Sequence, residues 1–141
     1  MQRVTADTNI LVSGITFPGG KPFQLLELAR QKKINLTVSQ PILAEVEDVL
    51  ARKFNWPPED IPEALSRIQS MARTVRPAVQ LDVIKDDPPD NRILECASSA
   101  GSDYIVTGDS HLLRLKQYDS IRILTVSDFL DVAVGQTREQ S

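Results

Sequence analysis

The sequence predicts an α/β protein in which a central, mainly parallel sheet lies between two layers of helices. Short apolar runs typical of strands alternate along the chain with segments whose apolar residues recur at helical spacing. Strands that alternate with helices form parallel sheets that are covered on both faces. The 141 residues suffice for one domain with its own core, and no internal repeat or composition shift indicates a second one.

Two strands and two helical segments are expected in the first forty residues. Residues 3–6 form a short strand, and the apolar residues 9–12 lead into a helical turn. A loop rich in Gly and Pro follows at 17–22. Apolar side chains then recur at helical spacing over 23–29, and the alternating residues 34–38 predict the second strand.

Two amphipathic helices are expected next. Ser39 followed by Pro41 is typical of a helix start, because the hydroxyl caps the first turn and the proline fits within it. This helix runs to about residue 54, and a second one spans about 59–73. Their apolar faces fit core packing or a homodimer interface, and core packing is the commoner use of such a stripe.

The second half of the chain repeats the alternation of strand and helix. The expected elements are a brief strand at 74–76, a helix at 90–100, a strand at 103–107, a helix at 110–117, a strand at 121–126 and a helix at 127–134. The polar residues 135–141 are expected to form a frayed tail. The domain is therefore expected to span residues 1–134.

Composition excludes several classes of protein. The single Cys96 excludes an internal disulfide and fits a reducing cytosol, and the lone His111 excludes a histidine-based zinc site. No apolar run approaches the roughly 20 residues that span a bilayer. Residues 1–7 lack the apolar stretch of a signal peptide. We therefore expect a cytoplasmic protein with no membrane partner.

Two acidic residues directly follow expected strands. Asp7 comes after the strand at 3–6, and Asp109 comes after the strand at 103–107. In open α/β sheets, functional sites form beyond the carboxyl ends of strands, where the strand order reverses. For each residue taken alone, a polar turn at Asp7 and a helix N-cap at Asp109 are equally good interpretations.

Two further acidic residues share helix faces with apolar residues. Glu45 lies four residues before Val49, so helical periodicity places it at the edge of the buried stripe. The alternative for Glu45 is a partly buried ion pair with Arg52. Asp90 lies three residues before Ile93 on the same face, and its alternative is a role in the charged first turn of the helix.

A cluster of these four carboxylates would suit a divalent cation. Hard oxygen ligands are what Mg²⁺ and Mn²⁺ prefer, and neighbouring carboxylates repel one another until a cation lies between them. Without these four charges the net charge of −3 becomes +1, and bound cations reverse the sign of the site itself. The acidic composition is therefore compatible with metal-assisted chemistry on a phosphate-bearing substrate.

The acidic phrases together resemble those of the PIN-domain ribonucleases. The match runs from Val4 to about Leu130, and it points to the compact bacterial or archaeal type thought to be toxins of toxin–antitoxin pairs. The matching phrases are Asp7-Thr8-Asn9, Glu45 on its helix, Asp90-Asn91-Arg92-Ile93-Leu94-Glu95-Cys96-Ala97, and Thr107-Gly108-Asp109-Ser110-His111-Leu112-Leu113.

The resemblance implies a three-layer α/β/α domain with a five-stranded sheet and an acidic pocket. It implies an endoribonuclease that cleaves single-stranded RNA with one or two Mg²⁺ or Mn²⁺ ions, and an antitoxin protein as partner. Carried over position by position, the catalytic and metal-binding residues are Asp7, Glu45, Asp90 and Asp109. Asn9 and Thr107 resemble polar residues that orient the ligands or a metal-bound water.

One position departs from the pattern. Related sequences often carry a further acid two residues after Asp109, where this chain has His111. We expect His111 to lie on the surface, so a fifth acidic ligand is absent from the expected site. Asp86 and Asp87 stand close to Asp90, and any of the three fits the role of metal ligand. Asp87 also fits a helix cap that leaves Asp90 free to point inward.

Three other protein classes are weaker interpretations. A haloacid dehalogenase phosphatase needs a second acid two residues after the first, where this chain has Asn9. A response-regulator receiver needs paired acids at the first strand end, and Ala6 precedes Asp7. A catalytically silent PIN scaffold that binds RNA or protein partners is the remaining alternative, and the complete set of four acids argues against it.

Overall fold

The computed structural model describes the backbone of residues 1–140 and the side chains of residues 1–133. Within this part of the chain, six strands form one sheet in the order β3-β2-β1-β4-β6-β5. The strands are β1 (Arg3–Ala6), β2 (Asn35–Ser39), β3 (Ala72–Val75), β4 (Tyr104–Val106), β5 (Gln117–Tyr118) and β6 (Ile121–Leu124). All pair in parallel except β5, which runs antiparallel to β6 at the edge.

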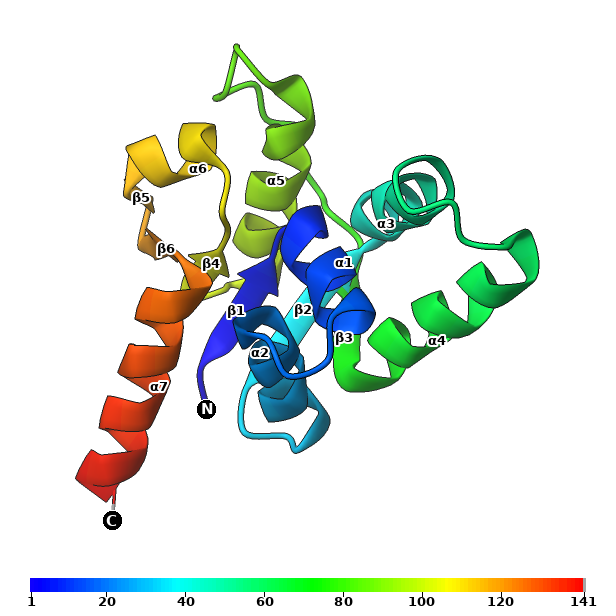
Figure 1. Ribbon diagram of the computed structural model, residues 1–141. Coiled ribbons are helices and arrows are strands. Elements are labelled where there is room, and N and C mark those ends of the chain that lie inside the picture. Colours follow the sequence, from blue (N-terminus) through cyan, green and yellow to red (C-terminus); the bar gives the residue numbers. More distant parts are fainter. Residues whose placement is uncertain (141) are drawn as a thin grey trace.

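Helices cover both faces of the sheet (Figure 1). The α-helices are α1 (Thr8–Thr16), α2 (Lys21–Arg30), α3 (Gln40–Arg52), α4 (Ile61–Met71), α5 (Asn91–Ala100), α6 (Ser110–Leu115) and α7 (Val126–Gln140). Helices α1 to α4 contact one another in one layer, which α7 joins through α2, and α5 packs against β1 to β4. Right-handed crossovers place α5 on the opposite face, because the chain there returns across the sheet.

The predicted α/β/α arrangement is confirmed, and the number of strands is wrong by one. The extra strand β5 has two residues, Gln117 and Tyr118, which is too short to leave an alternating pattern in the sequence. The strand expected at 74–76 begins earlier, because residues 72–75 pair in register with residues 36–39 of β2. Parallel pairing, not local composition, therefore sets its limits.

The last helix also differs from the expectation. It runs from Val126 to Gln140 and so includes most of the segment that was expected to be a frayed tail. The side chains of residues 134–140 and all of residue 141 lie outside the described residues. The domain boundary at residue 134 stays a prediction.

Local signals explain several helix ends. The Ser39 hydroxyl accepts a hydrogen bond from the backbone N–H of Ile42 at 3.4 Å, with Pro41 in the first turn, so the predicted start of α3 is confirmed. Helix α5 ends at Gly101, whose φ of +66° lies in the left-handed region that glycine adopts without strain. None of the helices in the described part of the chain is both long and apolar enough to cross a membrane.

The core fills the space between the sheet and its two helix layers. The apolar stripes of α3 and α4 lie inside the single chain, with Val46 and Ile68 fully buried. At the other end of the sheet, Phe129 of α7 is fully buried against Tyr104 of β4, with ring centroids 5.4 Å apart in an edge-to-face arrangement. Such a pair adds to the stabilisation from apolar burial.

Replacing Phe129 with Ala is expected to lower the free energy of unfolding by about 3–5 kcal/mol, because the deletion leaves a cavity beneath α7. The same deletion at Phe17, which is 56% exposed, is expected to cost about 1 kcal/mol or less through its edge contact with Phe54. Urea unfolding of both variants measures the two effects. Equal losses would show that α7 does not close the core.

Candidate metal centre

Asp7 lies at the carboxyl end of β1 and is the N-cap of α1. Its Oδ1 accepts a hydrogen bond from the backbone N–H of Ile10 at 2.9 Å, and its Oδ2 accepts one from the Thr107 hydroxyl. The residue is only 5% exposed. Burial raises the pKa of the Asp7 carboxyl, and the nearby Asp109 charge adds to this, while the two hydrogen bonds oppose it.

Asp109 occupies the equivalent place after β4. It caps α6, because its Oδ1 accepts hydrogen bonds from the backbone N–H groups of His111 and Leu112 at 2.8 and 3.1 Å. Its own N–H donates to the Thr107 hydroxyl at 2.9 Å. Thr107 therefore joins the two acids through one buried hydroxyl group. This is a geometry that would orient both carboxylates, as the sequence analysis expected of this residue.

Glu45 approaches the same place from α3. Together with Asp7 it belongs to a set of residues that line a small cavity of about 20 Å³, room for roughly one water molecule or ion. Burial raises the pKa of the Glu45 carboxyl, and the Thr8 hydroxyl opposes this. The lining residues are Asp7, Thr8, Asn9, Glu45, Asp90, Ile93 and Asp109.

The structure contradicts one of the alternative roles expected for these acids and confirms another. Arg52 pairs with Asp48 at 2.8 Å, so an ion pair between Arg52 and Glu45 is wrong. Asp109 does cap a helix, as its alternative interpretation expected, and Asp7 also caps one, where the alternative was a polar turn. Both residues also line the cavity. A carboxylate has about four lone-pair sites on its two oxygens, so the hydrogen bonds of the caps do not prevent either acid from also facing a cation.

Asp90 brings the fourth carboxylate, at the end of the short 3₁₀ helix Pro88–Asp90 that precedes α5. Burial is the largest cause that raises the pKa of Asp90 to about 8, and a side-chain hydrogen bond with Asp109 and the charges of Asp109, Asp87 and Asp7 add to it. For Asp109, burial acts in the same direction. The side-chain hydrogen bond with Asp90 and the two backbone N–H groups outweigh it and hold the pKa of Asp109 below its usual value.

Residues 76–87, which join β3 to the 3₁₀ helix Pro88–Asp90, are called the acidic loop. This loop contributes Asp87 to the site but not Asp86. Asp86 is exposed, whereas Asp87 is one of four residues whose possible ligand atoms all lie within 4.8 Å of one another: Asp87, Asp90, Asp109 and His111. Asp87 occupies the N-cap position of the 3₁₀ helix Pro88–Asp90, as expected, but its side chain makes no capping hydrogen bond.

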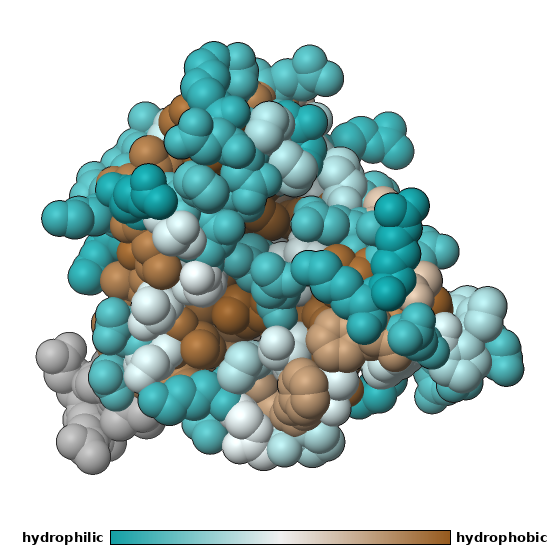
Figure 2. Space-filling model, turned by 45° about the horizontal axis from the view of Figure 1, so that its top comes forward, coloured by the Kyte–Doolittle hydropathy of each residue, from teal (hydrophilic) through white to brown (hydrophobic). Residues whose placement is uncertain are grey.

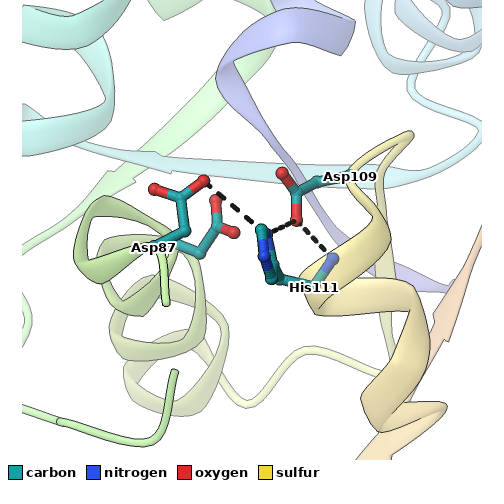
Figure 3. Close-up of side chains that lie close together, drawn as sticks. Asp87, Asp109 and His111 are labelled. Atoms are coloured by element: carbon teal, nitrogen blue, oxygen red, sulfur yellow. Dashed lines mark hydrogen bonds and ion pairs between the residues drawn. The ribbon is translucent and has the colours of Figure 1, made fainter. Parts of the chain in front are cut away.

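His111 was expected on the surface, and the structure places it only partly there. Its side chain is 30% exposed, and Nδ1 lies 3.5 Å from Asp109 Oδ1 and 3.9 Å from Asp87 Oδ2 (Figure 3). The position of this residue in the first turn of α6 follows from the cap at Asp109. Its approach to Asp87 follows from the neighbouring loop, which no local sequence signal places.

Three buried polar atoms at this site lack a hydrogen-bond donor or acceptor of ordinary geometry. They are Thr8 Oγ1, Asp90 Oδ2 and His111 Nδ1. Buried polar groups are normally satisfied, and no protein group in the described part of the chain satisfies these three atoms. A proton shared between carboxylates or a divalent cation would fill this role, and the oxygen-rich donor set fits the cation.

Asn91 holds the acidic loop in place, a role that the sequence analysis did not find. It is 1% exposed. Its Oδ1 accepts from the N–H groups of Val83 and Ile84 at 2.9 Å each, and its Nδ2 donates to the carbonyl groups of Ile84 and Pro88 at 2.9 and 3.0 Å. These bonds fix the chain on both sides of Asp87.

Two more side chains continue this row along α5. Glu95 Oε2 accepts from the N–H of Leu81 at 2.7 Å, and Ser99 Oγ accepts from the N–H of Ala78 at 3.3 Å. Residues 91, 95 and 99 recur every four positions, so they share one face of the helix. A polar position at that spacing beside a Pro-rich loop is the signal that could have revealed them.

The site lies at the top of Figure 1, where α1, α5 and α6 approach one another. The space-filling view turns this end toward the reader and shows hydrophilic side chains gathered over its upper part (Figure 2). The fold and the cavity thus define an α/β domain with an acidic pocket, of a kind suited to cations, beyond the carboxyl ends of its parallel strands.

Comparison with known proteins assigns the family. The model of the PIN domain family matches residues 3–111, so the chain belongs to the PIN domain family. An uncharacterized protein of Methanocaldococcus jannaschii is 28% identical over 118 residues, which cover 81% of this chain and 75% of that protein.

The fold is similar to that of a chain in the crystal structure of VapBC2 from Rickettsia felis bound to a DNA fragment from their promoter. The similarity to a chain of that structure has a TM-score of 0.62 and 17% sequence identity, and it covers 86% of this chain and 97% of that chain.

Replacing Asn91 with Ala is expected to lower the free energy of unfolding by about 2–4 kcal/mol, because four hydrogen bonds are lost and buried backbone groups are left without partners. Asn35 is exposed at the start of β2, so Asn35→Ala is the matched control and should change stability by about 0.5 kcal/mol or less. Urea unfolding with EDTA present compares the two. If the free energy of unfolding changed by a similarly small amount in both variants, contacts other than those of Asn91 would hold the loop in place.

The raised pKa of Asp90 predicts how metal-free stability depends on pH. Folded Asp90 stays protonated up to about pH 8, whereas the unfolded residue ionises near its ordinary value of 3.8. Its contribution to stability is therefore complete below that value and is lost as pH rises toward 8. In EDTA, Asp90→Asn should melt at a higher temperature than the wild type near pH 9 and at a similar temperature below pH 4.

The exposed Asp86 provides the control for this comparison. Asp86→Asn should melt like the wild type at both pH values, since its carboxylate lies away from the cluster. Thermal melting by circular dichroism measures all three proteins. A lower melting temperature of Asp90→Asn near pH 9 would contradict the assignment of Asp90 as a repelled carboxylate.

Proposed function

We propose that this chain is a Mg²⁺- or Mn²⁺-dependent endoribonuclease that cleaves single-stranded RNA. The observation that carries the proposal is the gathering of Asp7, Glu45, Asp90 and Asp109 around one small cavity with unsatisfied polar atoms. Membership of the PIN domain family supports the same reaction class. The four acids are assigned as the metal-binding and catalytic residues, with Asn9 and Thr107 orienting them.

Two pairs of acidic side chains would each hold one cation. Asp7 and Asp109, joined through Thr107, would hold one cation near the carboxyl ends of β1 and β4. Glu45 and Asp90 face the same cavity from α3 and from the start of α5 and would hold a second. Divalent cations at such a site supply Lewis acidity and an activated water at neutral pH.

The arrangement of the acids also favours cation binding before substrate binds. Burial and neighbouring charges raise the pKa values of Asp7, Glu45 and Asp90 and so disfavour the fully ionised site, and a cation relieves that repulsion. Cation binding therefore releases protons and stabilises the fold. An open pocket of this kind accepts an unstacked strand, which favours single-stranded RNA as substrate.

We further propose that the protein is the toxin of a toxin–antitoxin pair and acts in the cytoplasm with a cognate antitoxin as partner. The resemblance of the sequence phrases to small toxin-like PIN domains supports this. The similarity of fold to a chain of the VapBC2 structure, an assembly on promoter DNA, supports it as well. A homodimer through α3 and α4 is less favoured, because their apolar stripes are used in the core.

A catalytically silent scaffold is the second candidate function. It would keep the fold and bind RNA or a protein partner without cleavage. The complete acid set and the cavity argue for an enzyme, and the two functions differ in one measurable property, which is metal-dependent cleavage.

Replacing Asp7 with Asn is expected to reduce cleavage of labelled single-stranded RNA by roughly 10²-fold or more, because charge stabilisation at the reacting phosphate is lost. Asn is itself a good helix cap, so α1 and the fold should persist. Glu45→Gln should also lose activity, whereas Glu47→Gln, which is exposed on the same helix, should not. Cleavage is measured in Mn²⁺, in Mg²⁺ and in EDTA.

The outcomes separate the two candidate functions. Cleavage that needs metal and is lost in Asp7→Asn supports the nuclease. Wild-type activity in Asp7→Asn would contradict the site assignment. A folded protein that binds RNA but neither cleaves it nor binds a divalent cation would be the silent scaffold.

A further inference from the structure

The imidazole of His111 faces two carboxylates without a hydrogen bond to either. Nδ1 is buried, lies 3.5 Å from Asp109 Oδ1 and 3.9 Å from Asp87 Oδ2, and has no hydrogen-bond partner (Figure 3). An N–H that donates to a carboxylate in a charge-assisted bond normally lies about 2.7–2.9 Å from it. The observed separations are longer than that, so a directly shared proton does not explain this geometry.

The same separations suit three donor atoms that share one cation. Ligands at about 2.1 Å from a six-coordinate ion lie roughly 3 Å apart at right angles and about 4 Å apart across it. Both distances from Nδ1 fall within that range. The donor atoms of Asp87, Asp90, Asp109 and His111 all lie within 4.8 Å of one another, so small side-chain rotations would bring all four to one ion.

Independent evidence for an occupant comes from the adjoining cavity. Thr8 is 3% exposed, and its hydroxyl lines that cavity near the Glu45 carboxyl without making a hydrogen bond of ordinary geometry. Asp90 and Asp109 belong both to the cavity and to the His111 cluster. The cluster is therefore the outer part of a continuous site whose inner part also contains a buried polar atom without an ordinary hydrogen bond to the protein.

We propose that His111 Nδ1 is a metal ligand, together with Asp87 and Asp109, and that it makes this outer position select a first-row transition-metal dication such as Mn²⁺ over Mg²⁺. Imidazole nitrogen is a poorer ligand for the hard Mg²⁺ than a carboxylate oxygen is, whereas transition-metal ions accept it readily. The inference rests on the proposed function and refines it, because it concerns which cation the same site binds.

The test uses the full chain without a polyhistidine tag, stripped of metal and titrated with Mn²⁺. His111 is the sole histidine among the 141 residues, so imidazole ¹⁴N coupling to bound Mn²⁺ in pulsed electron paramagnetic resonance can arise only from this side chain. We expect that coupling in the wild type. Its absence from a protein that binds Mn²⁺ would overturn the proposal.

A substitution tests the selectivity. His111→Asp exchanges the nitrogen donor for oxygen and is expected to abolish the ¹⁴N coupling while Mn²⁺ still binds. Mg²⁺ should then displace Mn²⁺ at a concentration lower by about tenfold relative to the wild type, because an all-oxygen site suits it. The exposed Asp86→Asn is the control and should keep both the coupling and the wild-type ratio of affinities.

The results distinguish this inference from the proposed function. Equal Mg²⁺ displacement in wild type and His111→Asp would overturn the selectivity, even if RNA cleavage needs metal. A wild type that binds no Mn²⁺ at all would overturn both proposals. Circular dichroism melting of His111→Asp in EDTA establishes that the variant is folded before any loss of binding is attributed to the ligand exchange.

Discussion

The parallel pairing of β1 with β4 is the contact on which the site depends. Ala6 lies opposite Val106, and the N–H of Asp7 donates to the carbonyl of Val106 at 3.1 Å. The two strands therefore end side by side, although about a hundred residues separate them along the chain. Because the crossovers leave β1 toward β2 on one side and reach β4 on the other, this is where the strand order reverses and where a site is expected in an open sheet.

The fold holds this arrangement against electrostatic repulsion. Burial and neighbouring charges raise the pKa values of Asp7, Glu45 and Asp90. The opposing hydrogen bonds come from the Thr107 hydroxyl and the N–H of Ile10 at the start of α1 for Asp7, and from the Thr8 hydroxyl for Glu45. Helix capping and charge clustering are thus combined in the same carboxylates, and the repulsion that remains favours cation binding.

The acidic loop is held by hydrogen bonds to side chains of α5 and not by strand pairing. Residues 76–85 have no strand partner, and Asn91, Glu95 and Ser99 supply the hydrogen bonds that a neighbouring strand would give. A loop tied to one helix face can place Asp87 and Asp90 beside Asp109 without extending the sheet. The rigid helix, not the loop itself, sets the position of these carboxylates.

Much of the fold and part of the site follow from local sequence. Hydrophobic periodicity predicts most strands and helices within a few residues, and strand ends together with helical spacing bring Asp7, Glu45, Asp90 and Asp109 forward as candidates. These features are local, because a residue's face and its neighbours along the chain fix them. Tertiary structure alone decided the extra strand β5, the inward position of His111, the choice of Asp87 over Asp86, and the structural role of Asn91. Each of these depends on a contact between segments that the sequence does not pair, and only the packed sheet and the loop tied to α5 bring those segments together.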